Sequence, residues 1–470
     1  MPAKELSPID VYKLLPGTNC RECGETNCMA FAARLVNREV PLEKCPPLMD
    51  PRNKPLYDKL WDLLRPPIRA VEVGVGEGKV TLGGEYVVYR HELTYFHPTT
   101  IAIDLNDEMT EEEMEARIKA VKEFEYEYIG MKLKLDMLAI RSTSNDPSRF
   151  EAAVRKTWEA SKMPLILCSL DPTVMEQGLA AVPDKRPLIY AATKDNWREM
   201  AELAIMYGCP LVASSPFDLK GLKSLTKTLL EYGVKDIVLD PGTLGSEGLG
   251  ETLNNFTALR IAAIDRGDDL LGFPLLGTPI TVWSEEAEDP IINEWNEAML
   301  ASALIVRFAD ALIMHSISGW VLLPLVILRQ NIYTDPRKPV SVEPGIRSFG
   351  SPNELSPVLL TSNFALTYYT VASDIESAKV DCHLVVVDTE GLSVESAIAG
   401  RKMTAETVAE ALKNFRVGDL VKHRKLILPG RAARISGEVE ELSGWRALVG
   451  PLDSSGIPKF LSENWKPEMD

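Results

Sequence analysis

The segment Pro187-Leu-Ile-Tyr-Ala-Ala192 is followed by a helical pattern over residues 197–207 and then by a second short apolar run, Pro210-Leu-Val-Ala-Ser214. Both runs are almost wholly apolar, as strands are when a sheet is covered on both faces. A strand, a helix and another strand in this order form one unit of a parallel α/β sheet. The segment therefore predicts a parallel sheet with helices packed against it.

The same alternation extends along the chain in both directions. Eight short apolar runs are expected to form strands, over residues 99–104, 133–140, 164–169, 187–192, 210–214, 236–240, 272–276 and 311–315. Helical patterns separate many of them, over residues 111–124, 149–160, 197–207, 219–232, 252–264 and 290–308. Eight strand–helix units predict an α/β fold of the closed (β/α)8 barrel type.

Length and composition place this barrel within a chain of about three domains. The chain has 470 residues, of which 45% are hydrophobic and 25% are charged, as is typical of globular proteins. Beyond residue 339 the alternation restarts, with strands expected over residues 357–361, 383–388, 425–428 and 445–449, which predicts a small doubly wound α/β sheet. We expect domains over residues 1–60, 61–330 and 331–470, the second with a β-hairpin leading into the barrel.

Charge and hydropathy exclude several classes of partner. The formal net charge of -17 opposes the phosphate backbone, so nucleic acid is not an expected partner. The longest apolar stretch, residues 319–328, is too short to cross a bilayer and contains Pro324. The first ten residues lack the apolar core of a signal peptide. No membrane partner is expected, and the protein is expected to be cytoplasmic.

Four of the seven cysteines lie near the N-terminus. Cys20, Cys23, Cys28 and Cys45 have the spacing C-x2-C-x4-C-x16-C, and a proline follows the last of them. Thiolates select zinc or iron–sulfur clusters. A structural zinc site usually pairs two C-x2-C knuckles, and the second pair here is too widely spaced to form one. The spacing favours a [4Fe-4S] cluster, with zinc and free thiols as alternatives, and the other three cysteines are interpreted as core residues.

Polar residues follow several predicted barrel strands, at the end where such barrels bind ligands. They are Asp104, Asp171 and the stretches 193–196, 214–215 and 240–242. These side chains could hydrogen-bond a pterin ring, as in pterin-binding methyltransferase barrels, which the pattern resembles. The alternative, favoured for each residue singly, is that they cap the helices that follow. The glycine-containing run 72–84 has no Gly-Lys-Ser/Thr phosphate-loop ending and is interpreted as a hairpin.

The predicted strands of the C-terminal sheet lead into loops rich in small and hydroxyl residues. These loops cover residues 361–363, 389–394, 429–431 and 450–455. In an open α/β sheet the ligand lies beyond such strand ends, and flavin, nucleotide and corrinoid are all compatible with them. Asp381-Cys-His383 does not continue into the Asp-x-His-x-x-Gly loop that gives cobalt a histidine in many corrinoid proteins, because position 386 is valine. His383 is therefore interpreted as a structural residue.

Together these features resemble one family over essentially the whole chain. The motifs are Gly17-Thr-Asn-Cys20, Gly24-Glu-Thr-Asn-Cys28 and Asp388-Thr-Glu-Gly-Leu-Ser-Val394, with a barrel between them. They resemble the large (gamma) subunit of the corrinoid iron–sulfur protein of the acetyl-CoA decarbonylase/synthase complex.

The resemblance implies two cofactors and the residues that bind them. It assigns the four N-terminal cysteines to a [4Fe-4S] cluster, and the C-terminal loops to a corrinoid held base-off, without a protein histidine on cobalt. The corrinoid-binding residues are expected to be Thr361, Ser362, Asn363, Thr367, Gly391, Leu392, Ser393, Val394, Ser396, Gly430 and Arg431. No side chain is expected to be catalytic, because the cobalt carries the chemistry.

The resemblance also implies a reaction and its partners. Cob(I)amide would take a methyl group from a methylated tetrahydropterin and deliver it to the nickel–iron–sulfur site of acetyl-CoA synthase, or the reverse, while the cluster reduces Co(II). The expected partners are the small (delta) subunit, the acetyl-CoA synthase subunit, and methyltetrahydropterin or its methyltransferase. The chain is thus expected to be the methyltransferase component of a multi-subunit complex.

Two other functions remain open from the sequence. One is a pterin methyltransferase that works without cobalt, and the other is a non-catalytic iron–sulfur electron carrier or scaffold. Cobalt together with about four irons would favour the corrinoid carrier, whereas iron alone would favour the other two. The prolines at 46–47 and 66–67 and the linker 333–339 are expected to be hinges that let the outer domains move.

Overall fold

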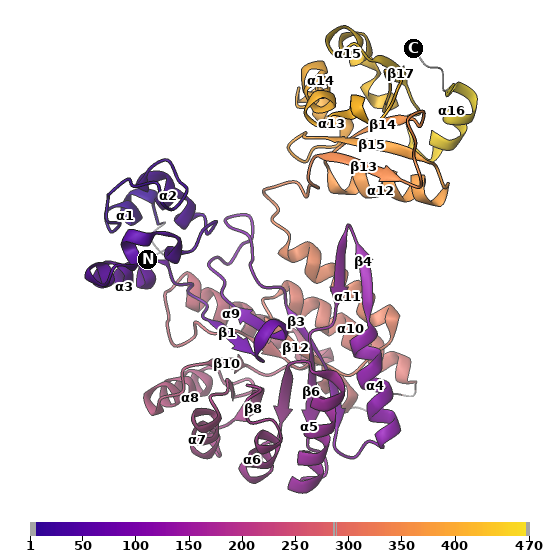
Figure 1. Cartoon of the computed structure of the whole chain (residues 1–470). Coiled ribbons are helices and arrows are strands. Elements are labelled where there is room, and N and C mark those ends of the chain that lie inside the picture. The colour runs from indigo at the N-terminus through magenta and orange to yellow at the C-terminus, as the bar shows by residue number, and fades with distance from the viewer. Residues whose placement is uncertain (1–5, 285–286, 288, 467–470) are drawn as a thin grey trace. The chain divides into compact units, whose positions relative to one another are not determined.

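A computed structural model of the chain describes residues 6–284, 287 and 289–466, so the first five and last four residues of the predicted outer domains lie outside the described residues. The chain divides into two compact units (Figure 1). One unit contains the residues up to 126 and residues 132–334, and the other contains residues 127–131 and those from 335 onward.

Within the described part of the first unit, eight parallel strands form a nearly closed barrel. Their order is β10-β9-β8-β7-β6-β3-β12-β11. Their bounds are β3 (Thr100–Asn106), β6 (Met137–Arg141), β7 (Leu165–Cys168), β8 (Leu188–Ala192), β9 (Leu211–Ser214), β10 (Ile237–Asp240), β11 (Leu276–Gly277) and β12 (Ala311–Met314). A parallel bridge between Leu239 and Leu275 joins the two ends of the sheet. The predicted barrel is confirmed.

Helices surround the barrel strands (Figure 1). They are α4 (Glu111–Glu123), α5 (Pro147–Ser161), α6 (Pro172–Ala181), α7 (Trp197–Tyr207), α8 (Leu219–Tyr232), α9 (Leu249–Ile264), α10 (Pro290–Val306) and α11 (Gly319–Tyr333). Local sequence sets several of their ends. Thr110 and Glu113 form a capping box that starts α4, and Gly208 ends α7 in the left-handed conformation, with φ of 64°.

The expectation of one strand over residues 133–140 is wrong. Met131–Lys134 is β5, which pairs with β4 (Glu125–Tyr128) in a separate two-stranded sheet. Ile129 and Gly130 both have positive φ, of 49° and 72°, which suits the tight turn between these two strands. Asp136 separates β5 from β6, because its carboxylate accepts a hydrogen bond from the backbone N–H of Ile101 at 2.9 Å and pairs with Arg329.

A hairpin precedes the barrel, as expected. β1 (Ala70–Val73) pairs antiparallel with β2 (Val80–Gly83). Val71, Val73 and Leu82 are buried in one cluster with side chains from the barrel strands. Because these barrel side chains include Ala102, Ile166 and Val212, the hairpin packs against the barrel interior.

The N-terminal region is built from short helices around a small core. It contains α1 (Pro8–Tyr12), α2 (Cys28–Val36), α3 (Lys54–Leu64) and the 3-10 helices η1 (Leu42–Lys44), η2 (Pro46–Met49) and η3 (Pro51–Asn53). Ser7 and Asp10 form a capping box that starts α1. Phe31, Leu48 and Leu60 are fully buried in the core that these elements share with three of the four clustered cysteines.

The second unit is a five-stranded sheet with helices. The strand order is β13-β15-β14-β16-β17, with β13 antiparallel and the others parallel. The elements are β13 (Gly345–Phe349), β14 (Val358–Ser362), α12 (Ala365–Ser377), β15 (Cys382–Val387), α13 (Val394–Ala399), α14 (Ala405–Asn414), β16 (Lys425–Leu428), α15 (Ser436–Ser443), β17 (Arg446–Val449) and α16 (Ile457–Asn464). Two buried clusters, built from alternate residues of the strands, show that both faces of the sheet are covered.

The strand order creates a switch point in this sheet. β14 lies between β15 and β16, so the chain leaves β14 towards one side and returns to it on the other. Ligands in open α/β sheets bind beyond the carboxyl ends of the strands at such a reversal. A ligand is therefore expected at the carboxyl ends of β14 and β16.

No helix in the part of the chain that the structure describes is long and apolar enough to span a membrane.

A buried carboxyl group beside the hairpin should make stability depend on pH. Glu85 is 2% exposed and accepts hydrogen bonds from the backbone N–H groups of Phe96 and His97, and burial raises its pKa to about 8. The folded state then binds a proton more tightly than the unfolded chain, so stability falls as pH rises towards and through this pKa. The free energy of unfolding of the parent protein should fall between pH 6 and pH 9, and we expect Glu85→Gln to make this fall smaller by about 2–3 kcal/mol. Thermal unfolding of both proteins at several pH values measures this, and parallel pH profiles would contradict it.

Candidate functional sites

The N-terminal cysteines gather around one bent loop. Cys23, Cys28 and Cys45 are buried and Cys20 is exposed. The backbone N–H of Asn19 donates to the Sγ of Cys28 at 3.3 Å, and the N–H of Cys28 donates to the Asn19 side chain at 2.8 Å. Asn19 itself has a positive φ of 49°. These two reciprocal hydrogen bonds hold the loop before Cys20 against Cys28.

The four thiols also interact electrostatically. Burial raises the pKa of the Cys45 thiol, and charge on Cys23, Cys28 and Cys20 raises it further, whereas the backbone N–H of Leu48 lowers it. Four thiolates in one place therefore require a cationic centre. Among the described residues, no group of three or more His, Cys, Asp or Glu is placed to hold a single metal ion.

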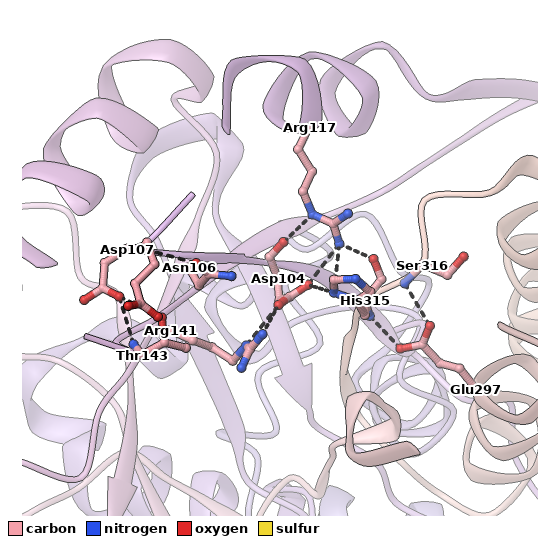
Figure 2. Close-up of polar contacts among 10 residues, drawn as sticks. Asp104, Asn106, Asp107, Arg117, Arg141, Thr143, Glu297, His315 and Ser316 are labelled. Carbon is pink, nitrogen blue, oxygen red and sulfur yellow. Dashed lines mark hydrogen bonds and ion pairs between the residues drawn. The ribbon is translucent and has the colours of Figure 1, made fainter. Parts of the chain in front are cut away.

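A second polar site lies at the carboxyl end of the barrel strands (Figure 2). Asp104, at the end of β3, is 0% exposed and lies among three basic groups. Arg117 from α4 donates to its Oδ1 at 2.9 Å, and Arg141 from the end of β6 donates to its Oδ2 at 2.6 Å. The Nδ1 of His315, which follows β12, lies 2.7 Å from Oδ1. Although burial by itself favours the neutral acid, these partners hold the pKa of Asp104 below its usual value.

Other polar residues at this end of the barrel are occupied by protein partners. Asp240 accepts hydrogen bonds from the hydroxyl groups of Tyr190 and Ser214 and from the backbone N–H of Gly242. The Asn196 side chain bonds to backbone groups through both its oxygen and its nitrogen. Neither side chain makes a capping hydrogen bond to a helix.

The expected capping is therefore correct for only some strand ends. Asp171 does cap α6, because it accepts from the N–H groups of Thr173 and Val174. The prediction of side-chain capping is wrong for Asp104, Asp240 and Asn196. Each of these side chains forms hydrogen bonds with a neighbouring strand or loop instead.

A third site is a crevice of about 420 Å³ in the second unit. Its walls come from the carboxyl halves of β14 and β16, the first turns of α12, the start of α13 and the loop after β17. The crevice therefore lies at the switch point of the sheet. The side chains of Leu366 and Leu452 line it and are 54% and 72% exposed, so apolar surface is open to solvent there.

Five of the eleven residues expected to bind a corrinoid line this crevice. They are Thr361, Thr367, Ser393, Val394 and Arg431. The hydroxyl group of Thr361 is buried and has no hydrogen-bond partner among the described residues. A buried hydroxyl without a partner is costly, so this group is available to a ligand.

The other six expected residues do not line the crevice, and several shape the loops beside it. Asn363 accepts hydrogen bonds from the backbone N–H groups of Thr389 and Gly391 at 2.9 and 3.0 Å, which holds the loop with Leu392 in place. Ser362 is buried, and its hydroxyl also lacks a partner in the described part of the chain. The N–H of Ser396 donates to Ser393, the residue that caps α13.

Gly430 is one of these six, and it lets two loops approach closely. A Cβ at this position would lie 2.8 Å from the carbonyl oxygen of Pro451. Any larger residue would push the loop after β17 away from the crevice.

Sequence reasoning missed the crevice residues on α12, which are Leu366, Thr370 and Val371. Leu452, Asp453 and Ser454 also line the crevice, and they lie in the loop 450–455 that the sequence predicts at the ligand end of the sheet. Positions 366, 367, 370 and 371 have the spacing of one helix face, which was a usable signal.

His383 lies at the opposite end of the sheet from the crevice. It is near the start of β15, is 6% exposed, and lies 3.0 Å from the hydroxyl of Ser348 through its Nδ1. Burial lowers its pKa, so the neutral imidazole is favoured.

Two family models match the chain. One is described as "CO dehydrogenase/acetyl-CoA synthase delta subunit" and matches residues 70–461. The other is described as "Putative Fe-S cluster" and matches residues 15–47, which contain the four clustered cysteines.

Curated relatives match over nearly their whole length. The acetyl-CoA decarbonylase/synthase complex subunit gamma of Methanosarcina acetivorans is 46% identical, covering 98% of this chain and 99% of that protein. The protein of the same name from Methanothermobacter thermautotrophicus is 43% identical, covering 98% of this chain and 99% of that protein. The one from Archaeoglobus fulgidus is 44% identical, covering 99% of this chain and 100% of that protein. Among solved structures, dihydropteroate synthase from Thermus thermophilus aligns with a TM-score of 0.37 and 19% identity, covering 50% of this chain and 95% of that one.

Proposed function

Since the chain belongs to the gamma-subunit family of the acetyl-CoA decarbonylase/synthase complex, we propose that it is a corrinoid iron–sulfur methyl carrier. It accepts a methyl group from a methylated tetrahydropterin and donates it to the nickel–iron–sulfur site of acetyl-CoA synthase, or the reverse. The proposal rests on one observation: the same chain has a crevice at the carboxyl ends of β14 and β16 and an N-terminal group of four cysteines, Cys20, Cys23, Cys28 and Cys45, which we call the thiol loop.

The crevice suits the corrinoid better than a small polar ligand. Its lining includes Leu359, Val371 and Ile427, and the exposed Leu366 and Leu452 form its lip, so a large flat ligand would cover apolar surface. The free hydroxyl of Thr361 and the nearby hydroxyls of α12 can bind polar groups on the ligand. The fit therefore rests on shape, apolar area and an unpaired donor.

The thiol loop suits a [4Fe-4S] cluster better than zinc. Cys45 interacts electrostatically with each of the other three thiols. The spacing C-x16-C between the last two cysteines is too wide for the second knuckle of a structural zinc site. In this proposal Cys20, Cys23, Cys28 and Cys45 would hold the cluster.

The chain's own residues perform positioning and shielding. When bound, the corrinoid supplies a cobalt that accepts and donates the methyl group, and the cluster supplies the electrons that keep this cobalt reduced. Thr361 and Thr367 would contact the ring, and Asn363 holds the loop 389–391 in place. A ligand that covered the apolar walls would remove them from water.

We further propose that the corrinoid is held base-off, without a protein histidine. No histidine lines the crevice among the described residues, and His383 faces Ser348 at the other end of β15. Without a protein imidazole at this site, the corrinoid would be easier to reduce, which suits a carrier that depends on reduced cobalt. We also propose three functional domains, which are a cluster domain over residues 1–60, a barrel over residues 61–330 and a corrinoid domain over residues 331–470.

The methyl carrier needs partners that approach the cobalt in turn. We propose that these are the delta subunit, the acetyl-CoA synthase subunit, and methyltetrahydropterin or its methyltransferase. A cobalt-independent pterin methyltransferase is less well supported, because Asp104, Asn196 and Asp240 at the barrel end are already bonded to protein groups.

A filled crevice should abolish corrinoid binding. Thr367 lies on the crevice side of α12, and Thr367→Trp would place an indole where the ring is expected. We expect cobalt per chain to fall at least tenfold while iron is unchanged, because the two cofactors use different parts of the chain. Metal analysis of the anaerobically purified protein measures both.

The matched control is Ser373→Trp, which adds the same bulk at an exposed position of α12 outside the crevice. It should retain cobalt. Full cobalt in Thr367→Trp, or cobalt absent from the parent protein, would reject the corrinoid assignment.

A further inference from the structure

The basic groups around Asp104 are not used by the proposed methyl carrier. Arg117, Arg141 and His315 converge on a single carboxylate at the carboxyl end of the barrel (Figure 2). Two guanidinium groups face one carboxylate, so the cluster has an excess of positive charge before any charge on His315 is counted.

Neighbouring carboxylates do not neutralise this excess. Asp107 accepts from the backbone N–H groups of Thr143 and Ser144 and from hydroxyl groups of the same loop. Glu297 accepts from the backbone N–H groups of His315 and Ser316. Among the described residues, neither carboxylate forms an ion pair with Arg117 or Arg141.

Two of the three basic groups, Arg141 and His315, are partly exposed to solvent, whereas Arg117 and the carboxylate are buried to a greater extent. The side chains of Arg141 and His315 are 35% and 29% exposed, and that of Asp104 is 0% exposed. Arg141 contacts Asp104 through Nε and Nη2, and His315 contacts it through Nδ1. Within the described part of the chain, the Nη1 of Arg141 and the Nε2 of His315 therefore have no protein partner.

The cluster is held in place before any ligand arrives. Asp104 fixes both side chains, the buried Glu297 fixes the backbone of His315, and the ring of Trp283 lies 4.6 Å from the ring of His315. Groups that are already ordered lose little entropy on binding. The site also lies at the strand ends where (β/α)8 barrels bind ligands.

We propose that the barrel mouth binds an oxyanion, a phosphate or carboxylate group, between Arg141 and His315, with Asp104 as the positioning residue. The Nη1 of Arg141 donates to one oxygen of the ligand, and the Nε2 of His315 supplies a second contact. This site is separate from the crevice and does not depend on the corrinoid proposal.

Anaerobic isothermal titration of the full-length purified protein tests the site. Inorganic phosphate and glutarate are titrated separately, so that the two arms distinguish a phosphate from a dicarboxylate. We expect one site for at least one probe, and at least tenfold weaker binding in Arg141→Gln, which loses a charged donor. His315→Ala should also weaken binding, and it decides the question if Arg141→Gln does not fold.

The matched control is Arg266→Gln. Arg266 is exposed and follows α9, at the other end of the barrel, because the helices run antiparallel to the strands. It should bind like the parent protein. Absence of binding by the parent protein to either probe, or equal affinity in the parent and a folded Arg141→Gln or His315→Ala variant, would overturn the proposal.

Discussion

Cys23→Ser is expected to reduce iron from about four atoms per chain to less than one, while leaving cobalt unchanged. Cys23 is buried in the N-terminal core with two other clustered cysteines, and a serine hydroxyl is a poor ligand for iron. Methyl transfer should continue when a chemical reductant keeps the cobalt as Co(I). Recovery from Co(II) with a physiological electron donor should be lost.

Cys209→Ser is the matched control for this experiment. Cys209 is a buried thiol in the first unit, outside the thiol loop, with a pKa raised to about 12 by burial. Its replacement should leave iron and reactivation unchanged. If the Cys23→Ser protein lacked iron and still recovered from Co(II) at the parent rate, the redox role of the cluster would be wrong.

Asp310→Ala should destabilise the barrel by about 3–5 kcal/mol, because it leaves the charge of Arg260 buried without its partner. The two side chains are 1% and 3% exposed and are joined at 2.7 Å. Asp310 also accepts from the backbone N–H of Leu275 at 2.7 Å, which ties β12 to the strand that closes the barrel. The midpoint of thermal unfolding should fall by about 10 °C.

Two comparisons separate this effect from a general loss of charge. Asp269→Ala removes one partner of the exposed ion pair with Arg65 and should cost less than about 1 kcal/mol. Arg260→Leu combined with Asp310→Leu should recover much of the loss, because no lone charge remains buried. A single Asp310→Ala variant as stable as the Asp269→Ala variant would show that the buried pair contributes little.

Local sequence was sufficient for the barrel and for the thiol loop. The strands over 187–192 and 210–214 are apolar on both faces and the helix between them has its own stop signal, so their assignment needs no distant contact. Three of the four clustered thiols lie within residues 20–28, and Cys45 follows within the same N-terminal region. Here the chemistry and the geometry are encoded within a few residues.

Sequence was less informative where a residue's role depends on a partner far along the chain. The resemblance assigns Asn363 to corrinoid binding, which stays a prediction, and the structure adds that its side chain holds the loop 389–391 in place. Asp104 was expected to cap a helix, but it meets His315, which is 211 positions away. When a side chain has several possible partners, its role is decided only when the fold brings one of those partners within hydrogen-bonding distance.

The sequence by itself determined that the chain has a thiol loop, a (β/α)8 barrel and a second α/β sheet, because residue spacing and apolar periodicity act over short distances. Only the tertiary structure decided where ligands can bind. The order β15-β14-β16 places Thr361 of β14 beside Leu428 of β16 in one crevice. The pairing of β3 with both β6 and β12 places Arg141 and His315 on either side of Asp104. Strand order is a property of long-range pairing, which no local pattern in the chain specifies.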